Sequence, residues 1–474
     1  MRFGLFFLAT ILATQGPALA APSAAEPPAQ DEHRARLFPR PAALEPQIRF
    51  WRAVFAEYSS HQIVLHDAVY LDKIYKVLDF RPQRDDGMDL GELARLERIE
   101  TDLEMDRIRA TLLRLHALGP NPQGLTAEEQ HIAQLFADDP APDRYLAAAD
   151  EKRLHSQRGL RERFGDGLRV SRRYLPEMER IFREEGLPVE LTRLPLIESC
   201  FNLEAYSKVG AAGIWQFMPA TGRRFMRVDH LVDERRDPIS STHAAAQFLG
   251  RVYDSLETWP LTITAYNHGP DGMARAVDET GTSDIGTIVR EYHGRAFGFA
   301  SRNFYAEFLA ALDVERDAKT YFGDLPAGPP LRWREHRLDR SIGIEAAARL
   351  ARTDRIELAS MNPALSSLVV QGRRPIPAGY RLRLPDGGAG FESRVAEFAA
   401  EQQVTRVAAP AVAKARPAVR SAVLTYRVRR GRTVSRAAAK RKVVVASAKS
   451  RKAPAKKSKQ RAVPKAKVRV AQKV

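Results

Sequence analysis

One carboxylate stands on an apolar stripe in the segment LPLIESCFN, residues 194–202. If the chain is helical after Pro195, the i, i+3, i+4 and i+7 positions of one face hold Leu194, Ile197, Glu198 and Phe201. Burial on such a face disfavours the ionised carboxylate and raises its pKa. A carboxyl group that keeps its proton near neutral pH can serve as a general acid. Glu198 is therefore the first candidate for chemistry, and the alternative is an ordinary solvated helix carboxylate.

The next segment, YSKVGAAGIWQFMPATG at residues 206–222, adds features of a binding site. Gly210 and Gly213 allow a tight backbone turn close to a ligand. Trp215 and Gln216 offer an apolar ring face and an amide, a combination that suits a sugar. Each of these features is weak when taken alone.

Three motifs in a fixed order make the combination specific. They are Glu198-Ser199 with Ser207, the run Gly210 to Pro219, and Ala265-Tyr266-Asn267-His268-Gly269-Pro270. Together they resemble the catalytic domain of the soluble lytic murein transglycosylases, over residues 170–320. The resemblance implies a mainly α, lysozyme-like fold of the goose type. It also implies cleavage of the bond between N-acetylmuramic acid and N-acetylglucosamine in peptidoglycan glycan strands, without a cofactor or metal.

The resemblance gives Glu198 both proton transfers. It would protonate the glycosidic oxygen and then take the proton of the muramoyl C6 hydroxyl group, which closes a 1,6-anhydro ring. Ordinary glycosidases use two carboxylates, so an internal nucleophile explains how one suffices. A lysozyme-type muramidase and a non-catalytic peptidoglycan-binding scaffold are the alternatives.

The same resemblance assigns substrate contacts to other positions. Ser207 would hold the acetamido group, although a turn residue is its alternative, and Tyr305 would bring its hydroxyl group to the catalytic carboxyl, although a core tyrosine is its alternative. The remaining positions would line the subsites or the floor of the cleft; they are Gln216, Met218, Tyr266 and Asn267. His268 and Cys200 depart from the family pattern, and we interpret Cys200 as a small buried filler rather than a reactive thiol.

The rest of the chain divides into further regions. The predicted order is a signal peptide (1–20) cleaved after Ala20, a disordered leader (21–44), a helical N-terminal region (45–165), the catalytic domain (170–320), a βααβ unit (331–386) and a basic low-complexity tail (390–474). The residue directly after the cleavage site is not a cysteine, so we expect an exported protein of the periplasm or cell envelope without a lipid anchor. In the βααβ unit we expect a strand near 333–337, helices near 343–352 and 355–361, and a closing strand within 376–385. The unit resembles a LysM module, which binds N-acetylglucosamine-containing glycan, and residues 425–441 resemble a degenerate second copy.

The net charge of +17 belongs to the tail. Residues 402–474 hold 23 Lys and Arg and no Asp or Glu, so the remaining 52 basic and 58 acidic residues leave the rest of the chain at −6. A basic run can bind phosphates, but export argues against nucleic acid. We expect anionic envelope polymers or a membrane surface as its partners.

Overall fold

The computed structural model describes residues 29–120, 122–326, 328–329, 331–386 and 390–398. The described residues up to Val395 belong to one compact unit. The predicted signal peptide, the fragment 425–441 and the tail beyond residue 398 lie outside the described residues. Within the described ranges, every helix is too short or too polar to traverse a lipid bilayer.

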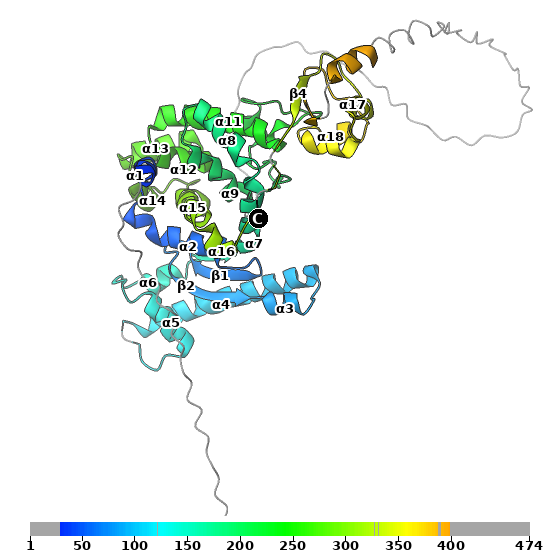
Figure 1. Ribbon diagram of the computed structural model, residues 1–474. Coiled ribbons are helices and arrows are strands. Elements are labelled where there is room, and N and C mark those ends of the chain that lie inside the picture. The colour runs from blue at the N-terminus through cyan, green and yellow to red at the C-terminus, as the bar shows by residue number, and fades with distance from the viewer. Residues whose placement is uncertain (1–28, 121, 327, 330, 387–389, 399–474) are drawn as a thin grey trace, which may run out of the picture. The chain divides into compact units, whose positions relative to one another are not determined.

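A central helix, α15 (Phe299–Arg316), organises the catalytic region. Three helices pack against it: α2 (Glu45–Ala56), α9 (Leu194–Ser199) and α12 (Trp259–His268). Figure 1 shows α15 nearly end-on, with these helices around it. Most of its side chains are buried, so α15 fixes the positions of the helices that carry the candidate site.

Further helices complete this core. They are α7 (Arg161–Ser171), α8 (Leu175–Glu184), η2 (Val189–Arg193), α10 (Pro219–Gly222), η3 (Glu234–Arg236), α11 (Pro238–Leu256), α13 (Pro270–Thr280), α14 (Ile285–Glu291) and α16 (Ala318–Phe322). The apolar stripe of α8 is buried, because Leu175, Met178, Ile181 and Phe182 lie on one face at helical spacing. The start of α11 is capped by Asp237, whose carboxylate accepts from the backbone N–H groups of Ile239 and Ser240.

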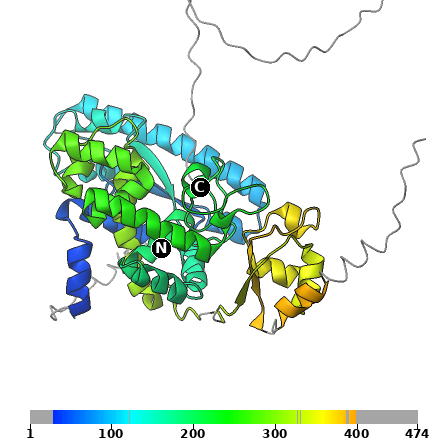
Figure 2. The same ribbon diagram turned by 90° about the horizontal axis from the view of Figure 1, so that it is seen from above.

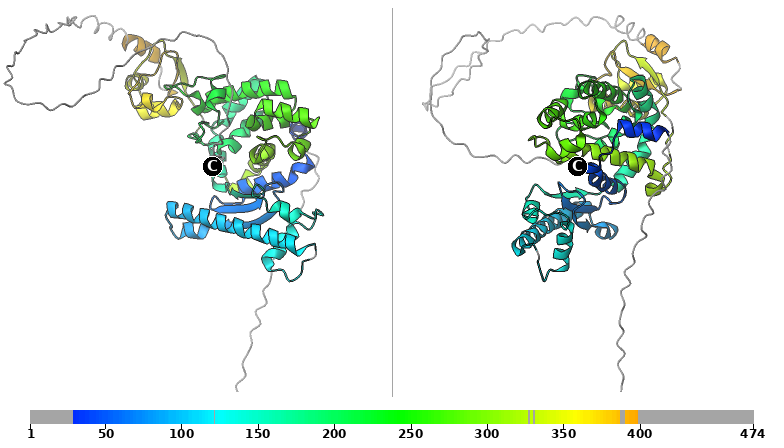
Figure 3. Two further views of the ribbon diagram at one scale, coloured as in Figure 1. Left: turned by 180° about the vertical axis from the view of Figure 1, so that it is seen from behind. Right: turned by 90° about the vertical axis from the view of Figure 1, so that its left-hand side faces the viewer.

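The N-terminal region is not all helical, and here the sequence-based prediction is wrong. Its β1 (Gln62–Asp67), β2 (Ile74–Asp79) and β3 (Leu154–Arg158) form an antiparallel sheet in the order β2-β1-β3. Alternate residues of the central strand β1 serve two cores: Val64 packs with the catalytic core, whereas Ile63 and Leu65 pack with the N-terminal helices. Those helices are α3 (Arg81–Asp85), α4 (Leu90–Leu118), α5 (Ala127–Leu135) and α6 (Arg144–Ala148). The sheet lies between α2 and α4, as Figures 1 and 3 show; Figure 2 gives the view from above.

The predicted disordered leader is also wrong for residues 29–44. This segment forms α1 (Ala29–Leu37) and the short helix η1 (Ala42–Leu44). Between them, Phe38 is 3% exposed and its ring meets Phe308 of α15 edge-on at 5.2 Å. The Arg40 guanidinium lies 2.8 Å from the Asp313 carboxylate, also on α15. The segment is therefore packed onto the central helix.

The C-terminal module, residues 331–386, follows the predicted order of elements. It comprises β4 (Arg334–Arg337), α17 (Ile344–Ala351), α18 (Arg355–Met361), a short extra helix α19 (Ser367–Val370) and β5 (Arg381–Leu384). The strands pair antiparallel, with Arg334 opposite Leu384 and Arg337 opposite Arg381. The side chain of Asn362, 1% exposed, bonds the backbone of Arg383 in both directions and so fastens the end of α18 to β5.

Candidate active site

Glu198 lies in the last turn of the six-residue helix α9. Pro195 occupies the first turn of that helix, where its missing N–H leaves no hydrogen bond unmade. Leu194 and Phe201 are buried, as the helical pattern predicts, whereas Ile197 and Glu198 are half-buried. The carboxylate is thus carried on a helix whose other face is anchored in the core, and it keeps partial access to solvent.

The backbone turns sharply directly after this helix. Cys200 and Phe201 both adopt the left-handed conformation, with φ of 48° and 53°. Ser199 Oγ donates to the carbonyl oxygen of Ile214 over 3.0 Å, which ties the end of α9 to the segment 205–218, hereafter the site loop. Burial raises the pKa of the Cys200 thiol to about 11, so it is protonated at neutral pH and is not a ready nucleophile.

The site loop is folded by short backbone contacts. Tyr206 bridges Ala212, which in turn bridges Phe217. Gly213 has φ of 74°, and a Cβ atom there would lie 1.7 Å from the carbonyl oxygen of Arg235. Glycine is therefore required at 213 both for its conformation and for the close approach of a second chain segment.

Two predicted binding residues hold this loop with their own side chains. Ser207 Oγ accepts from the N–H of Ala211 over 2.9 Å, and the Ser207 N–H donates to the Ala211 carbonyl, which is the turn role given above as its alternative. Gln216, at φ of 49°, donates from Nε2 to the carbonyl oxygen of Gly213 over 2.8 Å. Both side chains are half-buried, so neither is withdrawn from solvent.

Large apolar side chains stand exposed on the same loop. Met218 is 43% exposed, and Tyr206 and Val209 are 66% and 68% exposed. Met218 was among the predicted binding residues, whereas Tyr206 and Val209 were not. Their exposure arises from the folded loop, and a sequence pattern at those positions carries no signal for it.

Tyr266 and Asn267 come to the site from the C-terminal half of α12. The Tyr266 hydroxyl donates to the carbonyl oxygen of Trp215 over 2.8 Å. Burial raises the pKa of Tyr266 well above its usual value, and the negative charge of Glu198 raises it further, which shows that the phenol and the carboxylate interact. Asn267 Oδ1 accepts from Ser301 Oγ over 3.0 Å. Tyr266 is thus a predicted residue whose pKa responds to the charge of Glu198.

Tyr305 does not have the predicted placement. Its ring is fully buried, and its hydroxyl donates to the carbonyl oxygen of Pro39 over 2.7 Å. Burial raises its pKa, and the positive charge of Arg40 acts in the opposite direction. The neighbour of Tyr305 on α15 faces the site instead: the Phe304 ring lies parallel to that of Tyr266 with centroids 6.5 Å apart. Tyr305 is thus a tyrosine of the core, which was the alternative given for it in the sequence analysis.

Arg235 is the residue of this region that the sequence did not reveal. It is 3% exposed and donates to the carbonyl oxygens of Gly210 and Phe217 over 2.7 and 2.9 Å. Its charge is balanced by Asp233, which it meets through two nitrogen atoms. An arginine among several others in the run 223–236 carries no sequence signal for this role.

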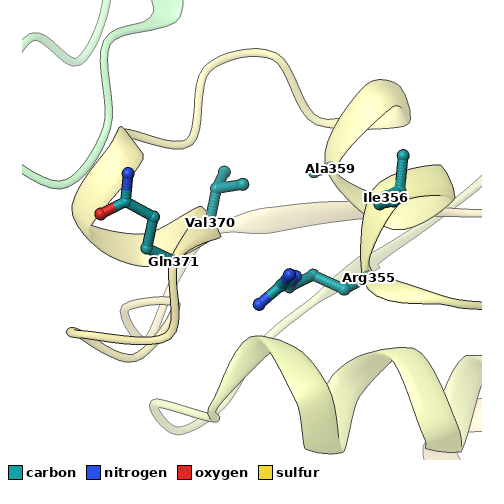
Figure 4. A pocket seen from close by; sticks show the side chains of 5 residues that line it. All are labelled: Arg355, Ile356, Ala359, Val370 and Gln371. Atoms are coloured by element: carbon teal, nitrogen blue, oxygen red, sulfur yellow. The ribbon is translucent and has the colours of Figure 1, made fainter.

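A surface hollow lies elsewhere among the described residues, in the C-terminal module. It has a volume of about 280 Å³ and lies between α18 and α19, as Figure 4 shows; its lining is Arg355, Ile356, Ala359, Val370 and Gln371. None of these residues was a predicted site residue. In the described ranges, no three His, Cys, Asp or Glu side chains are grouped as metal ligands.

Comparisons with known proteins address the same region. Residues 179–289 match the family model of the transglycosylase SLT domain. Membrane-bound lytic murein transglycosylase D from Escherichia coli K12, and its counterpart from E. coli O6:H1, are each 31% identical to this chain over 146 residues, which are 30% of this chain. The match spans about a third (32%) of the length of these relatives.

Among solved structures, a lytic transglycosylase Slt from Pseudomonas aeruginosa matches 44% of this chain and 33% of its own, at 20% identity and a TM-score of 0.27. That score is too low for the likeness to bear on the fold. The matched domain contains Glu198, the site loop and Tyr266. The comparisons thus confirm the resemblance expected from the sequence: residues 179–289 of this chain match the transglycosylase SLT domain.

Proposed function

We propose that this protein is an exported lytic transglycosylase of peptidoglycan with Glu198 as its single catalytic acid and base. The observation that carries the proposal is a half-buried carboxylate that acts on the pKa of Tyr266 inside a transglycosylase SLT domain. Tyr266 is protonated through the neutral range, since burial and the Glu198 charge move its pKa still further above neutrality. Tyr266 therefore adds no second negative charge to that of the carboxylate.

The reaction needs two proton transfers at one carboxyl group. Glu198 gives its proton to the glycosidic oxygen as the bond to C1 of N-acetylmuramic acid breaks, and N-acetylglucosamine leaves with a free hydroxyl group. The carboxylate then takes the proton of the C6 hydroxyl group, whose oxygen bonds C1 of the same sugar. The product is a 1,6-anhydromuramoyl end, no water is consumed, and Glu198 is again protonated.

The site loop supplies groups suited to the glycan. The exposed side chains of Tyr206, Val209 and Met218 offer apolar surface for the faces of sugar rings. Ser207 and Gln216 hold the loop by hydrogen bonds and, being half-buried, remain available to acetamido and hydroxyl groups of the substrate. Asn267 of α12, which accepts a hydrogen bond from Ser301, offers its side chain to the same groups. We assign substrate contacts to these residues and none to Tyr305.

The C-terminal module supports a second glycan contact. Its β4-α17-α18-β5 order is that of the LysM-like unit expected from the sequence. For the basic tail, outside the described residues, we propose anionic envelope polymers or a membrane surface as partners, because the predicted export separates it from nucleic acid.

The products of purified sacculi test the reaction. Muropeptides released by the full mature chain are treated with borohydride, which reduces a free sugar end but leaves an anhydro end unchanged, and are then weighed by mass spectrometry. We expect anhydro ends. Reducible ends would establish a lysozyme-type muramidase, and binding without release would establish a scaffold.

Glu198→Gln tests the assigned carboxylate. We expect turnover to fall about 10²- to 10⁴-fold, the usual contribution of a general acid–base, with sacculus binding and the melting temperature retained. Glu204→Gln is the matched control, because Glu204 is an exposed carboxylate six positions further along. Equal turnover in the two variants would remove Glu198 from the mechanism.

A further inference from the structure

The segment 227–237, hereafter the bridging loop, is hydrogen-bonded to the C-terminal module through its backbone. The N–H of Asp233 donates to the carbonyl of Ala364 over 2.8 Å, and the N–H of Ser366 donates to the carbonyl of Leu231 over 2.9 Å. Between these bonds Val232 and Leu365 form an antiparallel bridge. The module thus meets the catalytic core through a short sheet-like pairing and not only through side chains.

A buried ion pair reinforces this contact. Asp237 and Arg383 are 2% and 7% exposed, and the two nitrogen atoms of the Arg383 fork meet the two oxygen atoms of the Asp237 carboxylate, one at 3.0 Å. The guanidinium also lies over the Trp333 ring at 4.6 Å. Removal of one partner from such a pair leaves the other charge buried without compensation. Loss of Arg383 would therefore leave the buried Asp237 carboxylate without this partner, whereas Arg383 also meets Glu335 of β4 at 3.4 Å.

The same end of the bridging loop also holds the site loop. Arg235, two positions before Asp237, donates to the carbonyls of Gly210 and Phe217, which flank the turn at Gly213. Its own carbonyl oxygen lies where a side chain at Gly213 would stand. Gln216 and the Trp215 carbonyl that receives the Tyr266 hydroxyl both belong to the segment held in this way.

We propose that the C-terminal module is a positioning element of the active site: through Arg383 and the bridging loop it fixes the site loop opposite Glu198. The kinetic part of this inference rests on the proposed transglycosylase function. A module that only captured glycan would need no buried charge pair with the catalytic core. Arg383 is thus a positioning residue that acts through Asp237 and Arg235, and it does not contact substrate.

Hydrogen exchange tests the positioning without any reliance on activity. We compare the full mature chain with Arg383→Met, which keeps an unbranched apolar stem but removes the guanidinium group and its charge. We expect amide exchange across residues 205–218 to become about tenfold faster, because their local opening costs less free energy. Arg381→Met is the matched control, since Arg381 is exposed on the same strand. Unchanged exchange at 205–218 in Arg383→Met would overturn the proposal.

Turnover of a short soluble substrate, a tetrasaccharide muropeptide, separates positioning from glycan capture. We expect Arg383→Met to lower kcat about tenfold, since small misplacements of a site are costly, and Arg383→Lys to recover part of it. Loss confined to KM on sacculi, with kcat on the tetrasaccharide unchanged, would assign the module to capture alone and contradict the proposal. If the wild-type chain releases no product, the proposed function fails and the exchange comparison still decides the positioning.

If Arg383→Met does not fold, Asp237→Asn takes its place. An asparagine still caps α11 through its side-chain oxygen. Its NH2 group replaces the oxygen that accepts from Arg383 Nη1, so both the charge and that hydrogen bond are removed. We expect the same rise in exchange at 205–218, and a rate equal to that of the wild type would again overturn the proposal.

Discussion

At the scale of single residues, the site is marked by backbone strain. Cys200, Phe201 and Gln216 are three of the non-glycine residues with positive φ in the described chain, and they lie on the two segments that meet at Glu198. Each such conformation costs about 1–3 kcal/mol and persists only where its surroundings enforce it. Phe201 shows how: it is 1% exposed, and its ring lies 5.8 Å from that of Tyr174. The packing of the buried Phe201 ring thus stabilises the turn that ends α9 directly after Glu198.

The two buried tyrosines give a prediction at this scale. Tyr266→Phe removes the hydroxyl that bonds the Trp215 carbonyl next to Glu198, and we expect kcat/KM to fall about tenfold, equivalent to the loss of about 1.4 kcal/mol. Tyr305→Phe removes a bond to Pro39, and we expect it to destabilise the fold by about 1 kcal/mol with kcat/KM unchanged. Steady-state kinetics and urea unfolding of both variants measure the contrast. A larger kinetic loss in Tyr305→Phe would return that residue to the active site.

The same pair shows what a motif can and cannot provide. Tyr266 was predicted as a neighbour of Glu198 because it belongs to a dense motif on one helix, and the charge of Glu198 does act on its pKa. Tyr305 lies on a helix that is buried on nearly all sides, so the direction of its hydroxyl depends on the chain around it. Its partner, Pro39, is 266 positions away and was assigned to a disordered leader. No local pattern carries that information.

At the scale of elements, the helix that carries Glu198 depends on a close contact with α7. A Cβ atom on Gly167 of α7 would lie 2.4 Å from the carbonyl oxygen of Cys200, the residue that ends α9. Gly250, also within a helix, has open space: a Cβ there would meet only the Leu187 side chain at 3.9 Å. Gly167 is therefore needed for the close approach of two chain segments, whereas Gly250 is not, although both interrupt helical segments in the sequence.

We accordingly predict opposite effects of alanine at these positions. Gly167→Ala should destabilise the protein by about 1–3 kcal/mol, the usual cost of overpacking, and lower turnover because α9 must shift. Gly250→Ala should stabilise it by up to ~1 kcal/mol, the gain in helix propensity, without an effect on turnover. Chemical denaturation and turnover of sacculi measure both. Stabilisation by Gly167→Ala would mean that α7 and α9 are free to separate.

The elements differ in how well the sequence predicts them. The two main helices and the first strand of the C-terminal module were placed within one residue, because they are short and separated by clear turns. The closing strand begins five residues after the start of the range predicted for it, and α19 was not predicted. The sheet of the N-terminal region was missed, since β1 is buried on both faces and β3 lies almost ninety positions away from it. Arg235 and Arg383 were missed for the same reason: their partners are distant in the sequence or belong to the backbone.

At the scale of the whole molecule, a strap at the N-terminal end of the described chain closes the catalytic core. Residues 38–44 cross the central helix, where Phe38 and Leu44 are buried and Arg40 pairs with Asp313. The preceding α1 contributes less, because its described side chains are exposed or half-buried. The composition of this segment, rich in Ala and Pro, conceals its role: a few large side chains suffice when the surface that receives them is already formed by α15.

Two truncated chains test whether residues 38–44 stabilise the core more than α1 does. A chain that starts at Leu37 loses mostly exposed helix, and we expect its free energy of unfolding to stay within about 0.5 kcal/mol of that of the chain starting at Ala29. A chain that starts at Glu45 loses Phe38, Leu44 and the bond from Tyr305 to Pro39, so we expect a loss of about 3–5 kcal/mol, comparable to truncation of a large core side chain. Urea titration gives both values, and turnover of sacculi at a temperature where the longer chain is folded reports the consequence for the site. Equal stability of the two truncated chains would show that α15 holds the core together without the strap, and a loss already present in the chain from Leu37 would move the anchoring role to α1.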